Sequence, residues 1–545
     1  MQIFSFSPFG YEGSLVSIEV DLRRGIPAVD LVGLADGAVK ESRERMRSAI
    51  RNSGFDFPPE RVLISLSPAD LKKEGAGFDL AIALAVLCEK NRLDNLERVS
   101  EEMDFPPDDE PESKGIIGES ILVMGELELN GRVRPVRGIH AAVSTAFESG
   151  IRLCIVPAGN AQEAREIRGM RVFGAENLTD AFMAMENESS FSSGSDEDKS
   201  GKDCGIPDGA LNIGGVYFPA QDSTFDFSQV KNQQPLIRGL QIAAAGGHNI
   251  LAFGPPGCGK TLSMQRFGEL MPLLTLEEAQ SVTRIYSIAG LLSPGQPIVR
   301  KPPFRQPHQT ASLEGMCGGG SHCSPGEISL AHNGVLFLDE AAEFKTSVLQ
   351  MLRVPLESGA ITLSRAGRAT IYPARFQLLV AMNPCPCGFF DSKDKICLCS
   401  AKSVEQYWRK ISGPLLDRID IRIQVDGNTS ASDCGSMNSG REKSTEELRT
   451  EIARAVLTQR TRQGKKNAWL SPSEIRDFCT MDDSAGEILE AGTRRYGFSP
   501  RAVSECIKLA RTIADMGGKD VIDGKCMEEA VSLRKNEGGL GLCLD

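Results

Sequence analysis

Short apolar runs, separated by polar and glycine-rich stretches, follow one another through the first third of the chain. Alternating apolar and polar positions predict strands, and longer apolar or amphipathic runs predict helices. The expected strands lie at 15–20, 62–66 and 121–129, and the expected helices at 37–53 and 78–88. Gly54 ends the first helix, and Asn130-Gly131 marks a turn after the last strand. The pattern predicts an α/β domain and by itself indicates no chemistry.

The second half contains further short apolar strands and then a helical stretch. These strands are expected at 249–253, 335–338, 376–382 and 419–425. Ser499-Pro500 is typical of a helix start, because serine caps the first turn and proline fits the first helical position. We therefore expect an α/β core with a parallel sheet, followed by a helical C-terminal domain.

Polar segments divide these parts of the chain. Residues 99–114 hold seven acids and one lysine, and residues 185–203 hold six acids, two lysines and six serines. Neither segment can bury an apolar face, so both are expected to be loops. The expected divisions are an N-terminal domain at 1–184 with an acidic loop at 99–114, a flexible linker at 185–210, an α/β core at 211–428, a polar linker at 429–445 and a helical domain at 446–545.

Composition places the chain among ordinary globular proteins, with 545 residues, 41% hydrophobic and 25% charged. The net charge of −12 argues at first against binding to nucleic acid. However, the two acidic segments carry −6 and −4 of this charge, so the remainder is close to neutral. The longest apolar run, 80–88, is too short to cross a membrane, and we read no signal peptide. We expect a cytoplasmic protein without a membrane partner.

A phosphate-binding motif follows the strand at 249–253 and precedes a run compatible with a helix. Its residues are Gly254, Pro255, Pro256, Gly257, Cys258, Gly259, Lys260 and Thr261. The glycines let backbone N–H groups close around phosphate oxygens, and the helix N-terminus adds partial positive charge. We expect Lys260 to neutralise the β- and γ-phosphates of ATP and Thr261 to bind Mg²⁺.

Two acids end the strand at 335–338. We expect Asp339 to hold Mg²⁺ through water and Glu340 to orient and deprotonate the water that attacks ATP. Asn383, after the strand at 376–382, occupies the place from which an amide can reach the γ-phosphate. Having both acids predicts hydrolysis of the nucleotide and not only its binding.

Two arginines are candidates for contacts with a nucleotide. One could reach the nucleotide of a neighbouring subunit, and the other could act from a helical lid. Arg418 lies just before the strand at 419–425, where an arginine can reach the γ-phosphate of the next subunit in a ring. The alternative is a salt bridge with Asp417 or Asp420. Arg501, in the helix after Pro500, fits a sensor arginine on a helical lid, and the alternative is an ordinary surface arginine.

Four of the fifteen cysteines form two close pairs. Cys385, Cys387, Cys397 and Cys399 follow Asn383 in a loop that contains glycine, lysine and aspartate. Four thiolates bind Zn²⁺ tetrahedrally, although a spacing of one residue is tighter than the usual two. Structural zinc, free reduced thiols and a disulfide all remain open from the sequence.

Two basic segments are candidates for contact with DNA phosphates. Residues 361–376 are expected to form a hairpin with Arg365 and Arg368 on either side of its tip. Residues 449–466 hold six basic residues and one acid. Solvated surface is the alternative in both cases, and neither segment has a pattern that reads base sequence.

These motifs resemble the magnesium-chelatase-like AAA+ ATPases of the ComM/YifB type. The matching stretches in the second half are AAAGGHNILAFGPPGCGKT, SLAHNGVLFLDEAAEF, AMNPCPCGFF and SGPLLDRIDI. In the first half VDLVGLADGAVKESRERMRSAI and GELELNGRVRPVRGI resemble that family's Lon-protease-like domain. The resemblance implies a hexameric ring that drives branch migration of DNA with ATP and Mg²⁺, in support of recombination during natural transformation.

The chain departs from the family pattern at three places. The family usually has Pro-His-His-Thr where this chain has Pro307-His308-Gln309-Thr310, and Lys-Gly-Gln where it has Lys231-Asn232-Gln233. The turn at 74–77, where Lon proteases have a nucleophilic serine, contains no serine, threonine or cysteine. We therefore expect no peptidase activity.

Two other functions are compatible with the motifs. One is a chelatase-type motor that remodels a protein partner, and the other is an adaptor that uses the nucleotide as a switch. The combination of Glu340, Asn383 and Arg418 argues against a switch, because a switch needs no complete hydrolytic set.

Overall fold

The structure is a computed structural model of the chain. It describes residues 2–34, 37–69, 71, 73, 75–102, 120–187, 190–193, 205–221, 224–231, 233–292, 298–320, 323–365, 368–390, 395–425 and 442–535. Most of the acidic loop expected at 99–114, the middle of the linker expected at 185–210 and most of the linker expected at 429–445 lie outside these residues.

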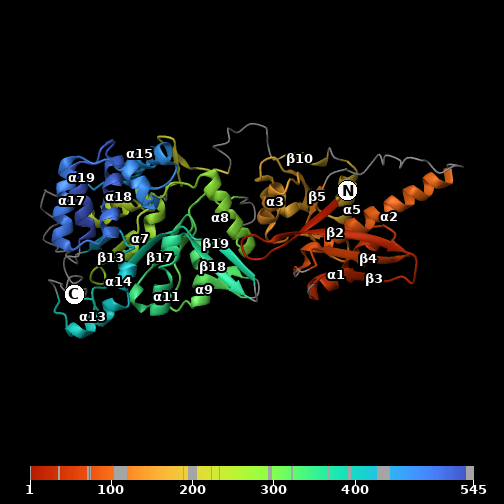
Figure 1. The fold of residues 1–545 in the computed structure, drawn as a ribbon, viewed down its shortest axis with the longest axis horizontal. Helices are drawn as coiled ribbons and strands as arrows, with labels where there is room; N and C mark the ends of the chain where they lie inside the picture. Colours follow the sequence, from red (N-terminus) through yellow and green to blue (C-terminus); the bar gives the residue numbers. More distant parts are fainter. Residues whose placement is uncertain are drawn as a thin grey trace.

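An eight-stranded mixed sheet forms the N-terminal part, in the order β10-β9-β8-β5-β1-β2-β4-β3 (Figure 1). Its strands are β1 (Gln2–Ser7), β2 (Ser14–Arg23), β3 (Val29–Val32), β4 (Arg61–Ser67), β5 (Ser120–Val123), β8 (Leu153–Pro157), β9 (Arg171–Ala175) and β10 (Ser192–Ser193). The helices are α1 (Gly37–Asn52), α2 (Asp79–Glu102), α3 (Ile139–Glu148), α4 (Ala161–Arg165) and α5 (Leu178–Glu186). Side chains of α1, α2 and α5 share one buried apolar cluster with the sheet, and α3 and α4 belong to a second.

The elements expected in this part are found, with two differences. Helix α2 runs on to Glu102, beyond the expected end at 88, so the first residues of the segment expected to be a loop at 99–114 are helical. The single strand expected over 121–129 is two strands, β5 and β6 (Glu126–Leu127), and β6 pairs with β7 (Val133–Arg134). The break falls at Gly125, where an added Cβ would lie only 2.8 Å from a methyl carbon of Val133 and 3.0 Å from one of Leu80. Close packing of the chain at Gly125 therefore ends the first strand.

Part of the segment expected to be a linker packs on the N-terminal sheet, which corrects that expectation. Ser192–Ser193 pairs antiparallel with β9, and Phe191 is 6% exposed within the apolar cluster. Its ring lies 6.0 Å from that of Phe173. The acidic composition concealed one aromatic residue whose burial holds this stretch on the sheet.

A five-stranded sheet forms the centre of the second part, and all its neighbouring strands run parallel. Its order is β14 (Phe304–Arg305), β17 (Val335–Leu338), β20 (Gln377–Met382), β13 (Ile250–Phe253) and β21 (Ile421–Gln424). Parallel strands buried on both faces are almost continuously apolar, and all residues of β13, β17 and β20 are buried. The short helices here are α9 (Leu313–Cys317), α10 (Glu327–Leu330), α11 (Thr346–Met351), α12 (Pro355–Ser358) and α14 (Gly413–Leu416).

Longer helices and three small hairpins surround this sheet. The helices are α6 (Gln234–Gly246), α7 (Lys260–Gln265), α8 (Leu276–Ala289) and α13 (Ala401–Arg409). The hairpins are β11 (Leu211–Ile213) with β12 (Val216–Phe218), β15 (Gly318–Gly319) with β16 (Ser324–Pro325), and β18 (Ala360–Arg365) with β19 (Arg368–Pro373). Figure 1 shows α8 and the β18–β19 hairpin on the side of the core that faces the N-terminal part.

Five helices complete the chain and pack against the core. They are α15 (Thr445–Gln463), α16 (Pro472–Phe478), α17 (Asp483–Tyr496), α18 (Pro500–Met516) and α19 (Gly524–Arg534). Their apolar residues share one buried cluster with α6, β13 and β21. Buried arginines fix the contact, since Arg449 donates to Glu269 O (2.7 Å) and Arg534 donates to Ile419 O (3.0 Å).

The N-terminal part contacts the core through α8. Arg284 donates to the backbone oxygens of Tyr11 (3.0 Å) and Glu12 (3.2 Å), and Ser287 Oγ donates to Glu163. Tyr11 N also donates to Thr370 Oγ1 of the β18–β19 hairpin (3.0 Å). The hairpin therefore contacts the N-terminal part directly, and a movement of the hairpin would change this contact. Among the described residues, no helix is long and apolar enough to span a bilayer.

Candidate functional site

The phosphate-binding loop lies at the carboxyl end of β13, the fourth strand of the sheet. Gly257 and Gly259 have φ angles of 80° and 84°, a region that glycine adopts without strain. An added Cβ would meet nothing within 4 Å at either residue, so the backbone leaves open space for phosphates. Helix α7 starts at Lys260, as expected of a loop that directs backbone N–H groups and a helix N-terminus at an anion.

Lys260 donates to its own loop. Its Nζ lies 2.7 Å from Gly254 O and 2.8 Å from Pro255 O, and the residue is 7% exposed. Gln233 supports the loop, because its Nε2 donates a hydrogen bond to the backbone oxygen of Cys258 at 2.6 Å. From the sequence, Gln233 stood out only as part of Lys231-Asn232-Gln233, and its contact with the loop was not predicted.

The two residues expected to bind Mg²⁺ lie together. Thr261 Oγ1 donates to Asp339 Oδ1 at 3.1 Å, across the gap between α7 and the end of β17. Asp339 Oδ1 also accepts from the backbone N–H of Glu340 at 3.0 Å. A hydroxyl and a carboxylate at this separation are hard oxygen ligands of the kind Mg²⁺ prefers, so the residues fit the ion.

Glu340 is held by a residue whose role the sequence did not predict. Gln309 Nε2 donates to a carboxylate oxygen of Glu340. Gln309 follows β14, the neighbour of β17, so the parallel pairing brings the two residues to the same edge. Glu340 itself has a φ of 49°, a left-handed conformation that is costly for a glutamate and that clusters at functional sites. The substitution of glutamine for the usual histidine therefore acts directly on the expected catalytic base.

Asn383 lies at the same edge as the loop and the two acids. Its strand β20 pairs with β13 so that Met382 is opposite Phe253, which places Asn383 beside Gly254. On its other side β20 pairs with β17, where Leu338 is opposite Val380. Three adjacent parallel strands therefore bring the loop, the acids and the asparagine together.

Arg418 and Arg501 lie at the opposite edge of this sheet. Arg418 O accepts from Asn249 Nδ2 (2.9 Å), and Asn249 is the residue before β13, whereas the phosphate-binding loop follows β13. Glu357 receives both guanidinium groups, as an ion pair with Arg418 and at 3.7 Å from Arg501. The Arg418 hydrogen bond lowers the pKa of the Glu357 carboxyl. Neither arginine is placed to reach the nucleotide of its own subunit.

The four cysteines converge on one point beside the phosphate-binding loop. Their Sγ atoms all lie within 4.8 Å of one another, with Cys385–Cys387 at 3.3 Å, Cys387–Cys397 at 3.5 Å and Cys385–Cys397 at 3.7 Å. A tetrahedral zinc with Zn–S bonds of about 2.3 Å needs S–S separations of about 3.8 Å. The described cysteines include no disulfide. The set therefore fits a structural zinc.

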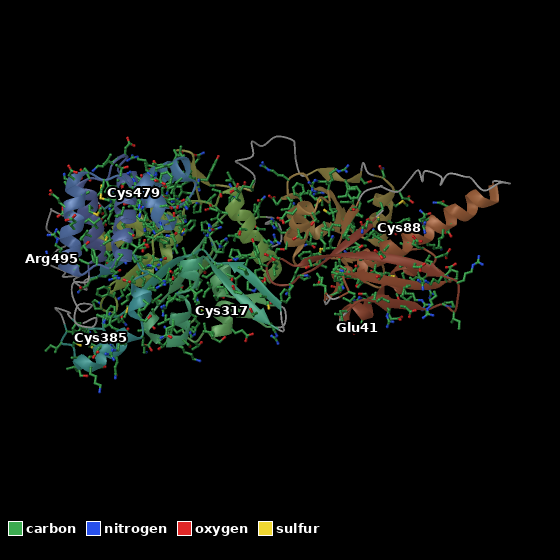
Figure 2. The ribbon with its side chains drawn as sticks, viewed as in Figure 1. Glu41, Cys88, Cys317, Cys385, Cys479 and Arg495 are labelled. Carbon is green, nitrogen blue, oxygen red and sulfur yellow. The ribbon has the colours of Figure 1, made fainter. Side chains whose placement is uncertain are left out.

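The cysteine cluster is local, and other cysteines lie apart from it. Figure 2 shows Cys88, Cys317 and Cys479 in three different parts of the molecule, far from Cys385. Two backbone N–H groups assist the thiolates, since Phe390 N donates to Cys385 Sγ (3.3 Å) and the N–H of Phe389 lowers the pKa of Cys387 to about 6. An added Cβ on Gly388 would lie 2.7 Å from Pro256, so this loop packs directly on the phosphate-binding loop.

The two basic segments have different environments. Arg365 is exposed, and its backbone pairs with that of Arg368 at the end of the hairpin; the side chain of Arg368 lies outside the described part of the chain. In the segment 449–466 several arginines are used internally. They include Arg449 with Glu269, Arg454 with Met516 O and Arg462 with Asp515. Most of this helix is therefore not a free basic face.

Comparisons with known proteins cover almost the whole chain. Family profiles match at 226–433 (magnesium chelatase, subunit ChlI), at 18–104 (subunit ChlI of Mg-chelatase) and at 442–534 (magnesium chelatase, subunit ChlI C-terminal). The uncharacterized protein YifB of Escherichia coli K12 is 38% identical over 525 residues, which cover 96% of this chain and 95% of that protein. The competence protein ComM of Haemophilus influenzae is 36% identical over 533 residues, 98% of this chain and 97% of that protein.

The chain belongs to the ComM/YifB family of magnesium-chelatase-like proteins. The profile at 226–433 includes the phosphate-binding loop, Asp339, Glu340 and Asn383, so this part is the family's AAA+ ATPase domain. A more distant relative, the magnesium-chelatase 38 kDa subunit of Rhodobacter capsulatus, is 26% identical over 29% of this chain and 50% of its own length. The sequence similarity to that subunit is therefore limited to part of this ComM/YifB protein.

Two substitutions separate nucleotide binding from hydrolysis in this ComM/YifB protein. Lys260→Ala removes the cation that faces the phosphates and should abolish ATP binding, whereas Glu340→Gln should keep binding and reduce hydrolysis by about 10²–10⁴. Filter binding of labelled ATP and phosphate release measure the two steps. Normal turnover by Glu340→Gln would contradict the role of Glu340 as the base.

A second prediction concerns the metal. Purified protein should contain close to one zinc per chain by elemental analysis, and the double variant Cys385→Ser/Cys397→Ser should lose it, because two of four ligands are removed. Cys317→Ser, outside the cluster, is the matched control and should retain zinc. Zinc well below one per chain in the unaltered protein would favour reduced thiols without metal.

Proposed function

We propose that this protein is a ring-shaped, hexameric ATPase motor that moves branched DNA. The observation that carries the proposal is the division of the catalytic set between the two edges of one sheet. Lys260, Asp339 and Glu340 lie at the carboxyl edge, and Arg418 lies at the amino edge. Arg418 therefore lies away from the phosphate-binding loop of its own subunit, and a neighbour in a ring could supply its Arg418 to that site.

Arg418 has the properties expected of such a shared residue. Its side chain is 12% exposed and is oriented by Glu357 and by Pro414 O (2.7 Å), so it is held rigidly and needs little ordering to act. An arginine that stabilises the charge of the transition state contributes roughly 10³–10⁵ in rate. Arg501 shares Glu357 and is proposed to act on the same neighbouring nucleotide.

The β18–β19 hairpin is the proposed contact with DNA. Arg365 is exposed near its tip, and Arg365 and Arg368 are backbone partners there. The hairpin lies in the chain between β17, which ends just before Asp339, and β20, which ends just before Asn383. Displacement of either strand end on hydrolysis would therefore be transmitted to the hairpin. Contacts from arginine to phosphate carry no base specificity, so the DNA is recognised by its charge and shape.

The relatives support a role in DNA processing. The similar protein of Haemophilus influenzae is named a competence protein, a name for proteins of natural transformation. We propose branch migration during recombination of incoming DNA as the activity, in the cytoplasm, with ATP and Mg²⁺ as cofactors and zinc as a structural ion. The helices α15–α19 are proposed to act as the lid of the ring ATPase.

A chelatase-type motor is the second candidate, favoured by the similarity to the magnesium-chelatase 38 kDa subunit. That similarity covers 29% of this chain and 50% of that subunit, so most of this chain lies outside the aligned part. A chelatase-type motor would not respond to DNA. Stimulation of ATP hydrolysis by forked DNA, compared with no DNA, distinguishes the two candidates.

Mixing of two inactive variants tests the shared site. Arg418→Ala should retain ATP binding and lose hydrolysis by about 10³ or more, and Lys260→Ala should lose binding. Mixed rings should regain part of the activity, because a Lys260→Ala subunit offers an intact Arg418 to its neighbour. The matched control is Arg418→Ala mixed with the double variant Lys260→Ala/Arg418→Ala, because no subunit of these rings offers Arg418. An absence of recovery in rings shown to contain both chains would contradict action between subunits.

A third substitution tests the DNA contact. Arg365→Ala/Arg368→Ala should reduce stimulation by forked DNA at least tenfold and leave basal ATP hydrolysis unchanged, because two phosphate contacts are lost while the nucleotide site is intact. The control is Arg409→Ala, an arginine whose side chain is 72% exposed and paired only with Glu405 on its own helix. Equal stimulation of the two variants would contradict the assignment of the hairpin.

A further inference from the structure

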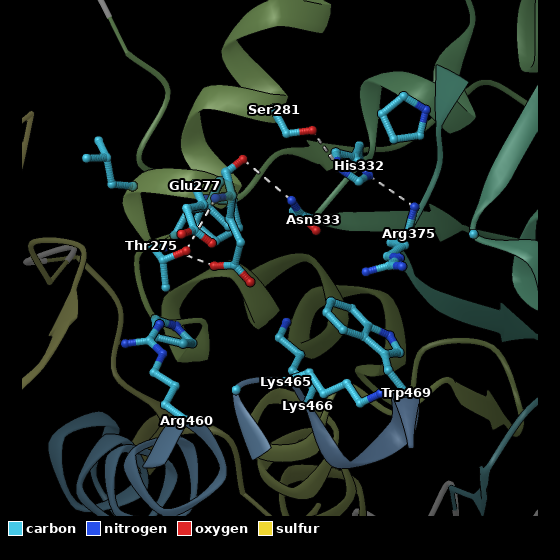
Figure 3. Close-up of a pocket in the computed structure, with 18 of the residues that line it drawn as sticks. Thr275, Glu277, Ser281, His332, Asn333, Arg375, Arg460, Lys465, Lys466 and Trp469 are labelled. Carbon is cyan, nitrogen blue, oxygen red and sulfur yellow. Dashed lines mark hydrogen bonds between the residues drawn. The ribbon is translucent and has the colours of Figure 1, made fainter. Parts of the chain in front are cut away.

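A large cavity of about 1010 Å³ lies where the three parts of the chain meet. Tyr11 comes from the N-terminal part, Ser281 and Asn333 from the core, and Arg460 and Trp469 from the C-terminal part. The volume is at the upper end of the range for ligand sites in proteins. Figure 3 shows side chains of the core above an open space and side chains of the C-terminal part below it.

This cavity is separate from the site that binds ATP. It is lined by the residues that precede the strands, among them Pro302 before β14, Asn333 before β17 and Arg375 before β20. The phosphate-binding loop follows β13, at the opposite edge of the same sheet. An occupant of the cavity would therefore be a second ligand.

Three cationic side chains at the cavity have no carboxylate partner in the described part of the chain. They are Arg375, Arg460 and Lys466. Arg460 makes only a long contact to Leu273 O (3.5 Å), whereas the fourth cation, Lys465, is paired with Glu474 at 2.7 Å. Burial lowers the pKa values of Arg460 and Lys466, although Glu278 acts in the opposite direction. Partly buried cations that form no ion pair with a carboxylate favour the binding of an anion.

An aromatic ring lies among these cations. Trp469 belongs to the short 3₁₀ turn Asn467–Trp469 and is half-buried at the cavity wall. The guanidinium of Arg375 lies 6.0 Å and the ammonium of Lys466 5.2 Å from its ring centroid. Rings bordered by cations are the usual platform for a nucleic-acid base, because the ring stacks on the base while the cations hold the phosphate.

The opposite wall is acidic and hydroxylic. Thr275 and Glu278 form the capping box of α8, with Thr275 N donating to the Glu278 carboxylate at 2.9 Å, and Glu277 beside them is exposed. Carboxylates repel phosphate and accept hydrogen bonds from hydroxyl and amino groups. A ligand with phosphate at one end and such donors at the other is oriented by the two walls.

We propose that this cavity binds a nucleotide unit, with its phosphate at Arg460 and Lys466 and its base on Trp469. The unit can come from a free mononucleotide or from a single strand of DNA; in the second case the inference rests on the proposed DNA motor. Because the cavity is lined by all three parts of the chain, its occupant would couple α8, the N-terminal part and the C-terminal helices.

Intrinsic fluorescence gives a direct test, since the chain has two tryptophans. Trp408 is 3% exposed and its indole N–H is bonded to Pro384 O (2.9 Å), so the difference in emission between the unaltered protein and Trp469→Phe reports Trp469. Two probes are titrated: dTMP, and an oligothymidylate of about twelve nucleotides. Quenching of the difference signal by either probe is expected, by dTMP for a mononucleotide site and by the oligonucleotide alone for a strand site.

Charge-removing variants show whether the quenching comes from the cavity. Arg460→Ala and Lys466→Ala should each raise about tenfold the probe concentration that gives half of the maximal quenching. Arg494→Ala removes the same charge from a side chain that is 81% exposed and outside the cavity, and it should have no effect. Quenching that is equal in all of these proteins would overturn the proposal.

The Trp469 difference signal and ATP hydrolysis together also decide the question, without any variant of a cationic residue. If the oligonucleotide stimulates ATP hydrolysis and neither probe changes the Trp469 signal, the cavity proposal is overturned and the motor proposal stands. If no DNA stimulates hydrolysis but dTMP quenches Trp469, the motor proposal fails and the cavity is a mononucleotide site.

Discussion

The parallel direction of the five core strands is the constraint on which the rest of the structure depends. Parallel strands place all their carboxyl ends at one edge of the sheet and all their amino ends at the other. Lys260, Glu340 and Asn383 follow strands and meet at the first edge. Arg418 and Arg375 precede strands and lie at the second. The ATPase chemistry and the proposed contacts with neighbours are thereby separated across one sheet.

The same sheet is linked mechanically to both flanking parts. Arg284 of helix α8 donates a hydrogen bond to the backbone of the N-terminal part. The β18–β19 hairpin accepts one from the backbone N–H of Tyr11 in that part. On the other face the C-terminal helices share their apolar core with α6 and β21. Well-packed interfaces of this kind transmit displacement because they resist gradual deformation. The hairpin and the cavity beside Trp469 are therefore connected to the phosphate-binding loop through packed elements.

Much of the nucleotide site was predictable because local sequence determines it. The glycines of the phosphate-binding loop, the apolar strand before it and the helix after it specify one local conformation, and the structure has that conformation at 254–261. For the four cysteines the sequence left structural zinc, reduced thiols and a disulfide open. The convergence of the four Sγ atoms favours zinc over a disulfide. The composition of the acidic segment around Phe191 predicted a linker, but part of it packs on the sheet. Composition averages over the whole stretch, whereas the burial of one aromatic residue holds it in place.

The sequence by itself predicted most of the elements, their order and the residues that we propose to bind phosphate and Mg²⁺, because these depend on short-range pattern. Only the tertiary structure decided the pairing of Gln309 with Glu340, the meeting of Arg418 and Arg501 at Glu357, and the arrangement of unpaired cations around Trp469. Each of these joins residues from separate elements. Their proximity is fixed by sheet order and helix packing, which no local pattern encodes.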